Sequence, residues 1–244
     1  MCSIDDRQNC INKFFFTNLI DMIKRFYMFM LLPVILFAHG VPTGDQGYIQ
    51  EISGVNFIPF MYLGAKHMVT GYDHLLFLVG VIFFLYRLKD IGIYVSLFAV
   101  GHSSTLLFGV FADIHINAYI IDAIIGLSVV YKALDNLDAF QKWFGIEPNT
   151  KISTFVFGLF HGFGLAAKII EFELDTNGLF TNLIAFNVGV EIGQLLALSA
   201  ILIAMSYWRK KPSFFSYANS TNIVLMILGF ILTGQQLYGY FNSI

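Results

Sequence analysis

The sequence is poor in cysteine and in charge, and each shortage excludes a class of protein or of site. Both cysteines, Cys2 and Cys10, fall within the first ten residues, so the rest of the chain has neither a thiolate ligand nor a disulfide. Any metal bound farther along must therefore use His, Asp, Glu, Met or backbone ligands. Only 12% of the 244 residues are charged, against about a quarter in a typical soluble domain. The net charge is −2, and no basic patch indicates binding to nucleic acid.

Apolar residues are abundant instead, and they occur in runs long enough to cross a membrane. The chain is 57% hydrophobic, contains 27 Phe and has a mean hydropathy of +0.71. These values predict an all-α, polytopic membrane helix bundle with about six transmembrane helices. The first span covers about residues 55–86. The others are expected at about residues 91–112, 116–134, 152–170, 179–207 and 220–241.

The first span contains Gly64 and Gly71, which leaves two interpretations open. It forms either one long helix, kinked near Gly71, or two separate elements, which would give seven helical segments in all. Together, the spans would form a single transmembrane helical domain over residues 55–244.

The N-terminal residues resemble a secretory signal more than a membrane span. Lys24 and Arg25 precede an apolar run of twelve residues, 26–37, which is too short to span a bilayer and ends before Ala38. We therefore predict that residues 1–38 are an N-terminal extension and signal peptide that is removed, with a retained short anchor as the alternative. Residues 39–54 would then form a short extracytoplasmic lead.

Basic residues alternate between the connections of the predicted spans. They occupy the first, third and fifth connections, as Arg87 and Lys89, then Lys132, Lys142 and Lys151, then Arg209, Lys210 and Lys211. The second connection has no Lys or Arg, and the fourth is acidic. By the positive-inside rule this pattern predicts that both mature termini are extracytoplasmic.

Side chains able to bind a metal lie near the middle of four predicted spans. They are Asp73 and His74 in the first span, His102 in the second, His161 in the fourth, and Glu191 and Gln194 in the fifth. A carboxylate at this depth costs about 3 kcal/mol on insertion scales. A bound divalent cation or a neighbouring imidazole would offset that cost, so these residues predict a shared polar site.

Helical spacing supports a common interior for these groups. One stripe comprises Gly64, His67, Gly71 and His74, and another comprises Asn187, Glu191 and Gln194. On a straight helix His67 and His74 are about 10 Å apart, too far to share one ion. Either Gly71 breaks the helix or His67 is an outer station on a path to His74.

The predicted metal ligands are therefore His67, Asp73, His74, His102, His161 and Glu191. Supporting or outer access positions are Ser103, Thr105, Asp122, Asn187, Gln194 and His39. His39 would combine a free amine and an imidazole if cleavage follows Ala38, although a flexible polar residue is the favoured interpretation.

Several motifs in this order resemble the HupE/UreJ family of bacterial membrane proteins, in the branch with a signal peptide. HMVTGYDH is similar to the His, five residues, Asp-His motif of that family, and GHSSTLLF, FGLFHGFGLA and AFNVGVEIGQ are similar to its later motifs. The segment IDAIIGLSVVYKALDN resembles another, with Asp122 where the branch commonly has Glu. In some relatives a glutamate closely follows the His-Gly motif, whereas here Glu171 lies ten residues on and Glu191 lies on the next span. The similarity covers about residues 55–207.

The resemblance implies a nickel or cobalt permease of the bacterial inner membrane, tied to metalloenzyme maturation. The residues themselves favour transport of Ni²⁺, Co²⁺ or Zn²⁺ as substrate across the lipid bilayer, and a homo-oligomer is compatible with them. The alternative is an intramembrane zinc-dependent hydrolase acting on a lipid or a membrane peptide, with Glu191 as general base. The chain has no HExxH pair, which disfavours a protease.

Overall fold

A computed structural model of the chain describes residues 53–171 and 176–243, which belong to one compact unit. The predicted signal peptide, most of the extracytoplasmic lead and His39 lie outside these residues. Within the described ranges the chain forms helices and no strand, which confirms the all-α prediction. The helices are α3 (Phe57–Thr70), α4 (Tyr72–Ile82), α5 (Leu88–Phe111), α6 (Ala118–Asn136), α7 (Ala139–Phe144), α8 (Thr150–Glu171), α9 (Leu179–Arg209) and α10 (Ser213–Ser243).

Four helices of the described part are long and apolar enough to cross a membrane: α5, α8, α9 and α10. The predicted first span is divided into α3 and α4, of 14 and 11 residues. Helix α6 has 19 residues but contains three charged ones, Asp122, Lys132 and Asp135. The membrane character of the chain is thus supported, and the count of six crossings stays a prediction.

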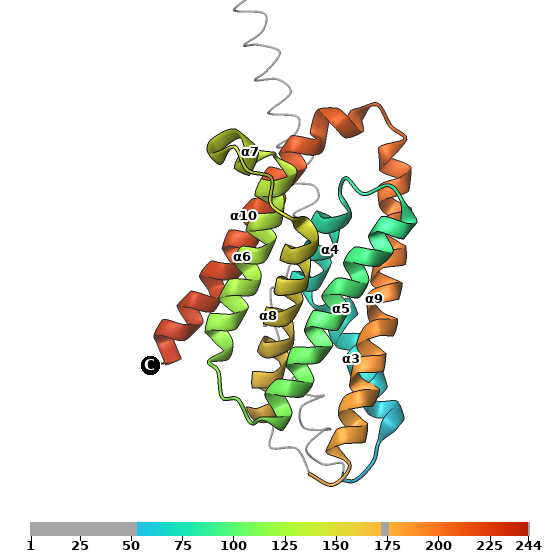
Figure 1. Ribbon diagram of the computed structural model, residues 1–244, viewed down its shortest axis with the longest axis vertical. Helices are drawn as coiled ribbons and strands as arrows, with labels where there is room; N and C mark the ends of the chain where they lie inside the picture. Colours follow the sequence, from blue (N-terminus) through green and yellow to red (C-terminus); the bar gives the residue numbers. More distant parts are fainter. Residues whose placement is uncertain (1–52, 172–175, 244) are drawn as a thin grey trace, which may run out of the picture. The chain divides into compact units, whose positions relative to one another are not determined.

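The helices pack in three close pairs, α5 with α8, α3 with α9, and α6 with α10 (Figure 1). Each pair uses glycine where the two backbones meet. A Cβ atom on Gly64 of α3 would overlap the carbonyl of Phe186 in α9, and one on Gly158 of α8 would overlap the carbonyl of Phe98 in α5. Small residues at such positions let membrane helices approach closely, which brings the side chains of neighbouring helices together.

The C-terminal end of α4 is held by side chains from two other helices. The last carbonyls of a helix have no partner within it. Here Asn136 of α6 donates a hydrogen bond to the Gly80 carbonyl at 2.9 Å. Arg209 of α9 donates to the carbonyls of Ile82 and Phe83. These bonds anchor α4 and so determine where its other end, at Gly71, lies in the bundle.

Candidate metal centre

The candidate centre begins at a one-residue break between α3 and α4. Gly71 has an extended backbone, with φ −71° and ψ 108°. Its N–H donates to the His67 carbonyl at 2.9 Å, which is the last bond of α3, and its carbonyl accepts from the Leu75 N–H at 3.1 Å. The structure therefore decides between the two interpretations of this span, because the helix is broken at Gly71.

A side chain at the break would displace the polar groups beside it. A Cβ atom on residue 71 would lie 2.6 Å from Nδ1 of His74 and 2.9 Å from Oδ1 of Asp73. The break brings the imidazoles of His67 and His74 together, with ring centroids 5.0 Å apart instead of the roughly 10 Å of a straight helix. The stretch from residue 67 to 74 thus contributes three polar groups to one place.

His74 is the centre of a cluster of four imidazoles from four helices. Its ring centroid lies 5.0 Å from that of His161 on α8 and 6.1 Å from that of His102 on α5, in addition to His67 on α3. Ligand atoms of Asp73, His74 and His161 all lie within 4.8 Å of one another, and all three residues are buried. The structure therefore brings together five of the six predicted ligands.

Hydrogen bonds orient two of these imidazoles. Nδ1 of His74 lies 3.0 Å from Oδ1 of Asp73, so this nitrogen donates its proton and Nε2 carries the lone pair. Nδ1 of His161 donates to the Phe157 carbonyl at 2.7 Å, which again leaves the lone pair on Nε2. A carboxylate or carbonyl behind the imidazole is the usual arrangement at metal sites, where it selects the tautomer and orients the ring.

Buried nitrogens in the cluster lack hydrogen-bond partners. Among the described residues, none pairs with Nε2 of His74 or with either ring nitrogen of His102. His102 is 0% exposed and His74 is 3% exposed, so neither ring reaches bulk solvent. Buried polar groups without a partner are rare because each costs free energy, and a cation or a water molecule could satisfy them. The donor set therefore fits a cation.

Close packing of α5 on α8 places His102 beside His161. A Cβ atom on Gly162 would overlap the His102 carbonyl and the Thr105 hydroxyl. That hydroxyl donates to the Leu159 carbonyl across the interface at 2.7 Å. Thr105, predicted as a supporting residue, therefore joins the two helices that carry these histidines.

Phenylalanines that sequence reasoning did not single out form the wall of the cluster. The Phe98 ring lies 4.9 Å from that of His161 and 6.2 Å from that of His74, and the Phe77 ring lies 5.7 Å from His161. Both are 2% exposed. They exclude water and lower the local dielectric constant, which strengthens electrostatic interactions between the site and a cation.

Glu191 lies apart from the cluster, contrary to the expectation from its helical stripe. Its side chain is exposed. Gly189 and Gly193 of α9 face α3, and two residues along a helix turn the side chain by about 200°. Glu191 therefore points away from α3, onto the same outer face as the exposed Val188 and Leu195.

The other supporting positions have separate surroundings. Asp122 is buried and forms an ion pair with Lys168 at 2.6 Å, which joins α6 to α8. The opposite charges in two neighbouring predicted spans are the sequence signal for this pair. Gln194 is buried and faces the Val95 carbonyl of α5, 3.4 Å from its amide nitrogen. Asn187 bonds back to its own helix, and Ser103 is half-buried.

Comparison with known proteins yields one family. The family described as HupE / UreJ protein matches residues 43–244, which is most of the chain. No curated protein and no solved structure matches.

Proposed function

The chain belongs to the HupE/UreJ family, and on that premise we propose that it transports a divalent transition-metal ion, with nickel or cobalt preferred. The family is associated with nickel and cobalt uptake or with metalloenzyme maturation. The ion would be held by the imidazoles of His67, His74, His102 and His161, with Asp73 orienting His74. The observation that carries the proposal is their convergence at the break between α3 and α4, within the predicted first span.

A broken helix supports transport because it offers a cation two kinds of group. At Gly71 the C-terminal carbonyls of α3 meet the N-terminal turn of α4, which contains Asp73. The carbonyls favour a cation, and the helix terminus stabilises the carboxylate. Discontinuous helices form substrate sites near the bilayer midplane in many secondary transporters.

The donor set favours a borderline divalent ion. Imidazole nitrogen and carboxylate oxygen suit Ni²⁺, Co²⁺ and Zn²⁺, and the body of the chain has no thiolate. His67 is half-buried, whereas His74 and His102 are buried. This gradation would let an ion pass from His67 to the inner imidazoles, and several weak sites suit passage better than one closed cage.

The hydrolase alternative requires a general base close to the metal. Glu191, the residue expected in that role, is exposed on the outer face of α9. Asp73 already accepts a hydrogen bond from His74, which suits a positioning role. Transport is therefore the better interpretation of the geometry.

The test is metal accumulation in cells that express the full chain or the variants His74→Ala and His161→Ala. We expect nickel or cobalt uptake to fall to the level of cells without the protein, because each variant removes a central ligand. Uptake at the level of the unmodified chain would refute the proposal.

His115→Ala is a matched control. This histidine lies in the α5–α6 connection, is 72% exposed and pairs with Asp113. Its removal should leave uptake unchanged, which separates the loss of a ligand from the loss of any histidine. Membrane levels of each variant must be measured in parallel, so that failure to accumulate protein is not mistaken for failure to transport.

A further inference from the structure

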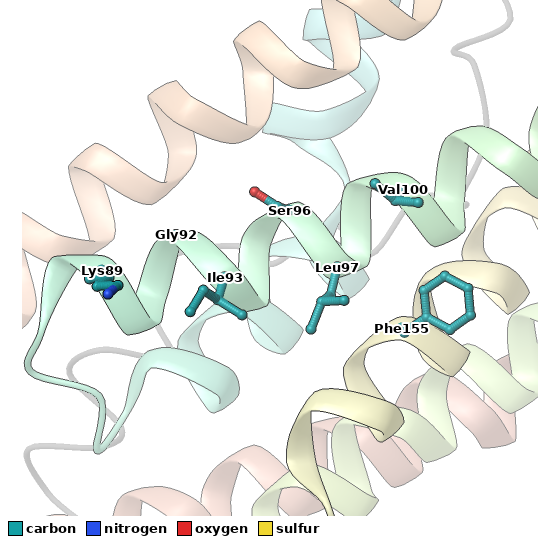
Figure 2. A pocket seen from close by; sticks show the side chains of 7 residues that line it. All are labelled: Lys89, Gly92, Ile93, Ser96, Leu97, Val100 and Phe155. Atoms are coloured by element: carbon teal, nitrogen blue, oxygen red, sulfur yellow. The ribbon is translucent and has the colours of Figure 1, made fainter.

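A groove of about 450 Å³ follows the outside of α5, and none of the imidazole cluster lines it (Figure 2). Its volume lies within the roughly 300–1,000 Å³ range of ligand-binding pockets. It is lined by Lys89, Gly92, Ile93, Ser96, Leu97 and Val100 of α5 and by Phe155 of α8.

Small side chains lie along the α5 side of this groove. Gly92 and Ser96 are both exposed and lie one helical turn apart, with the exposed Val100 one turn farther on. A Cβ atom on Gly92 would meet no other atom within 4 Å. The face is therefore open, and Phe155 forms its wall on the side of α8.

The length and charge of the groove match one lipid molecule. From Lys89 to Val100 the helix rises about 16 Å, which is close to half of the roughly 30 Å hydrocarbon core, or one leaflet. Lys89 is the one charged residue in the lining and lies at the end of the groove, and the other six residues are uncharged. The groove thus presents a cation at the membrane surface and an apolar channel below it.

We propose that this groove binds an anionic phospholipid, with the phosphate at Lys89 and one acyl chain along α5 from Gly92 to Val100. Arg87, which is exposed two residues earlier, adds positive charge at the same surface. Basic residues next to a span attract anionic lipids, and each changes the affinity about fivefold.

Charge also decides between a lipid and a second copy of the chain. A two-fold interface along this face of α5, with its axis along the membrane normal, would place both copies of Lys89 at the same depth. Arg87 of each copy would lie nearby, so the like charges would repel. An anionic headgroup is complementary to the same residues.

The experiment measures which lipid the purified full chain retains. The protein is equilibrated with equimolar dioleoylphosphatidylglycerol and dioleoylphosphatidylcholine in mixed micelles and repurified, and bound lipid is quantified by mass spectrometry. We expect enrichment of phosphatidylglycerol. Lys89→Gln should reduce that enrichment about fivefold, and Lys89→Arg should preserve it.

A second variant and a control separate the groove from charge alone. Gly92→Leu places a side chain in the groove and should release bound lipid of both kinds, with Ser96→Leu as a substitute if Gly92→Leu does not fold. Lys151→Gln removes an exposed lysine at the start of α8, outside the groove, and should have no effect.

Equal retention of the two lipids by the unmodified chain would overturn the proposal. So would unchanged retention in Lys89→Gln and in the variants that fill the groove. A dimer that Gly92→Leu dissociates, without any loss of bound lipid, would identify a second copy as the occupant and would also overturn it.

Discussion

The polar groups at the two ends of α4 differ in whether they have hydrogen-bond partners. At its C-terminal end, the carbonyls of Gly80, Ile82 and Phe83 accept hydrogen bonds from Asn136 and Arg209. At its N-terminal end, Nε2 of His74 has no partner among the described residues, and neither ring nitrogen of the nearby His102 has one.

Within this helix of 11 residues, the polar contacts at the C-terminal end have a structural role, and the groups at the N-terminal end fit the metal site proposed above. Side chains from α6 and α9 complete the C-terminal end, as a stable helix terminus inside a bundle requires. At the other end the same bundle leaves ring nitrogens of His74 and His102 without a partner among the described residues, which suits the metal ion of the proposed function. We call residues 80–83 the anchored end of α4, and Asp73 and His74 its open end. The hydrogen bonds at the anchored end hold α4 in the position that places the open end beside the other histidines.

The largest effect on metal binding is expected from Gly71→Ala. It would join α3 and α4 into one helix and so remove the open end. Alanine favours a continuous helix by about 1 kcal/mol, and its Cβ would displace both His74 and Asp73. We expect metal affinity to fall about 100-fold, as for the strongest losses of residues that orient a ligand. Titration of the purified full chain with nickel or cobalt measures this loss.

Gly92→Ala is the matched control, because a Cβ atom there meets nothing within 4 Å. It should leave metal affinity unchanged. If Gly71→Ala binds metal as tightly as the unmodified chain, the break at Gly71 does not form the site.

Arg209→Met changes the anchored end. It should lower the thermal stability of the protein more than its affinity for metal. The variant removes charged hydrogen bonds to Ile82 and Phe83 and the contact of the guanidinium with Tyr86, 4.6 Å from the ring centroid. Charged hydrogen bonds contribute about 2 kcal/mol, so we expect a lower midpoint of thermal unfolding in detergent.

Lys210→Met is the control for loss of positive charge at this end of α9, since Lys210 is exposed. It should unfold at the same temperature as the unmodified chain. If Arg209→Met instead weakens metal binding and leaves thermal stability unchanged, the anchored end is not a purely structural contact.

Asp73→Asn separates the negative charge of Asp73 from its hydrogen bond to His74. An amide oxygen still accepts the proton of His74 Nδ1, so the ring keeps its orientation, but the negative charge is lost. We expect about tenfold weaker metal binding, at the low end for residues that support a ligand. Asp73→Ala should weaken binding further, because the ring then loses its acceptor, and equal losses in both variants would assign Asp73 as a direct ligand.

The polar residues around the open end can be predicted from the sequence, whereas the contacts at the anchored end cannot. His67, Asp73, His74, His102 and His161 are recognisable because polar groups at midplane depth are rare. Asn136 and Arg209 lie near span ends, where such residues are common, so nothing in the sequence connects them with α4. Their partners are backbone carbonyls, which every residue has.

Helical phase explains the one predicted ligand that lies elsewhere. Glu191 lies near the middle of α9, a helix long and apolar enough to cross a membrane, as counting residues predicts. Its direction depends on which face of α9 packs against α3, and Gly189 and Gly193 determine that face. The spacing of Asn187, Glu191 and Gln194 predicts a stripe but not the neighbour that it faces.

The smallest effect on transport is therefore expected from Glu191→Gln. The carboxylate lies on an exposed apolar face with Val188 and Leu195, and it costs about 3 kcal/mol at this depth. Removing its charge should leave metal uptake within about twofold of the unmodified chain, as for surface substitutions, and should keep or raise thermal stability. Glu147→Gln, in the exposed connection before α8, is the control. Loss of uptake as complete as in His161→Ala would instead place Glu191 on the path of the ion, which would require α9 to rotate its outer face toward the imidazoles.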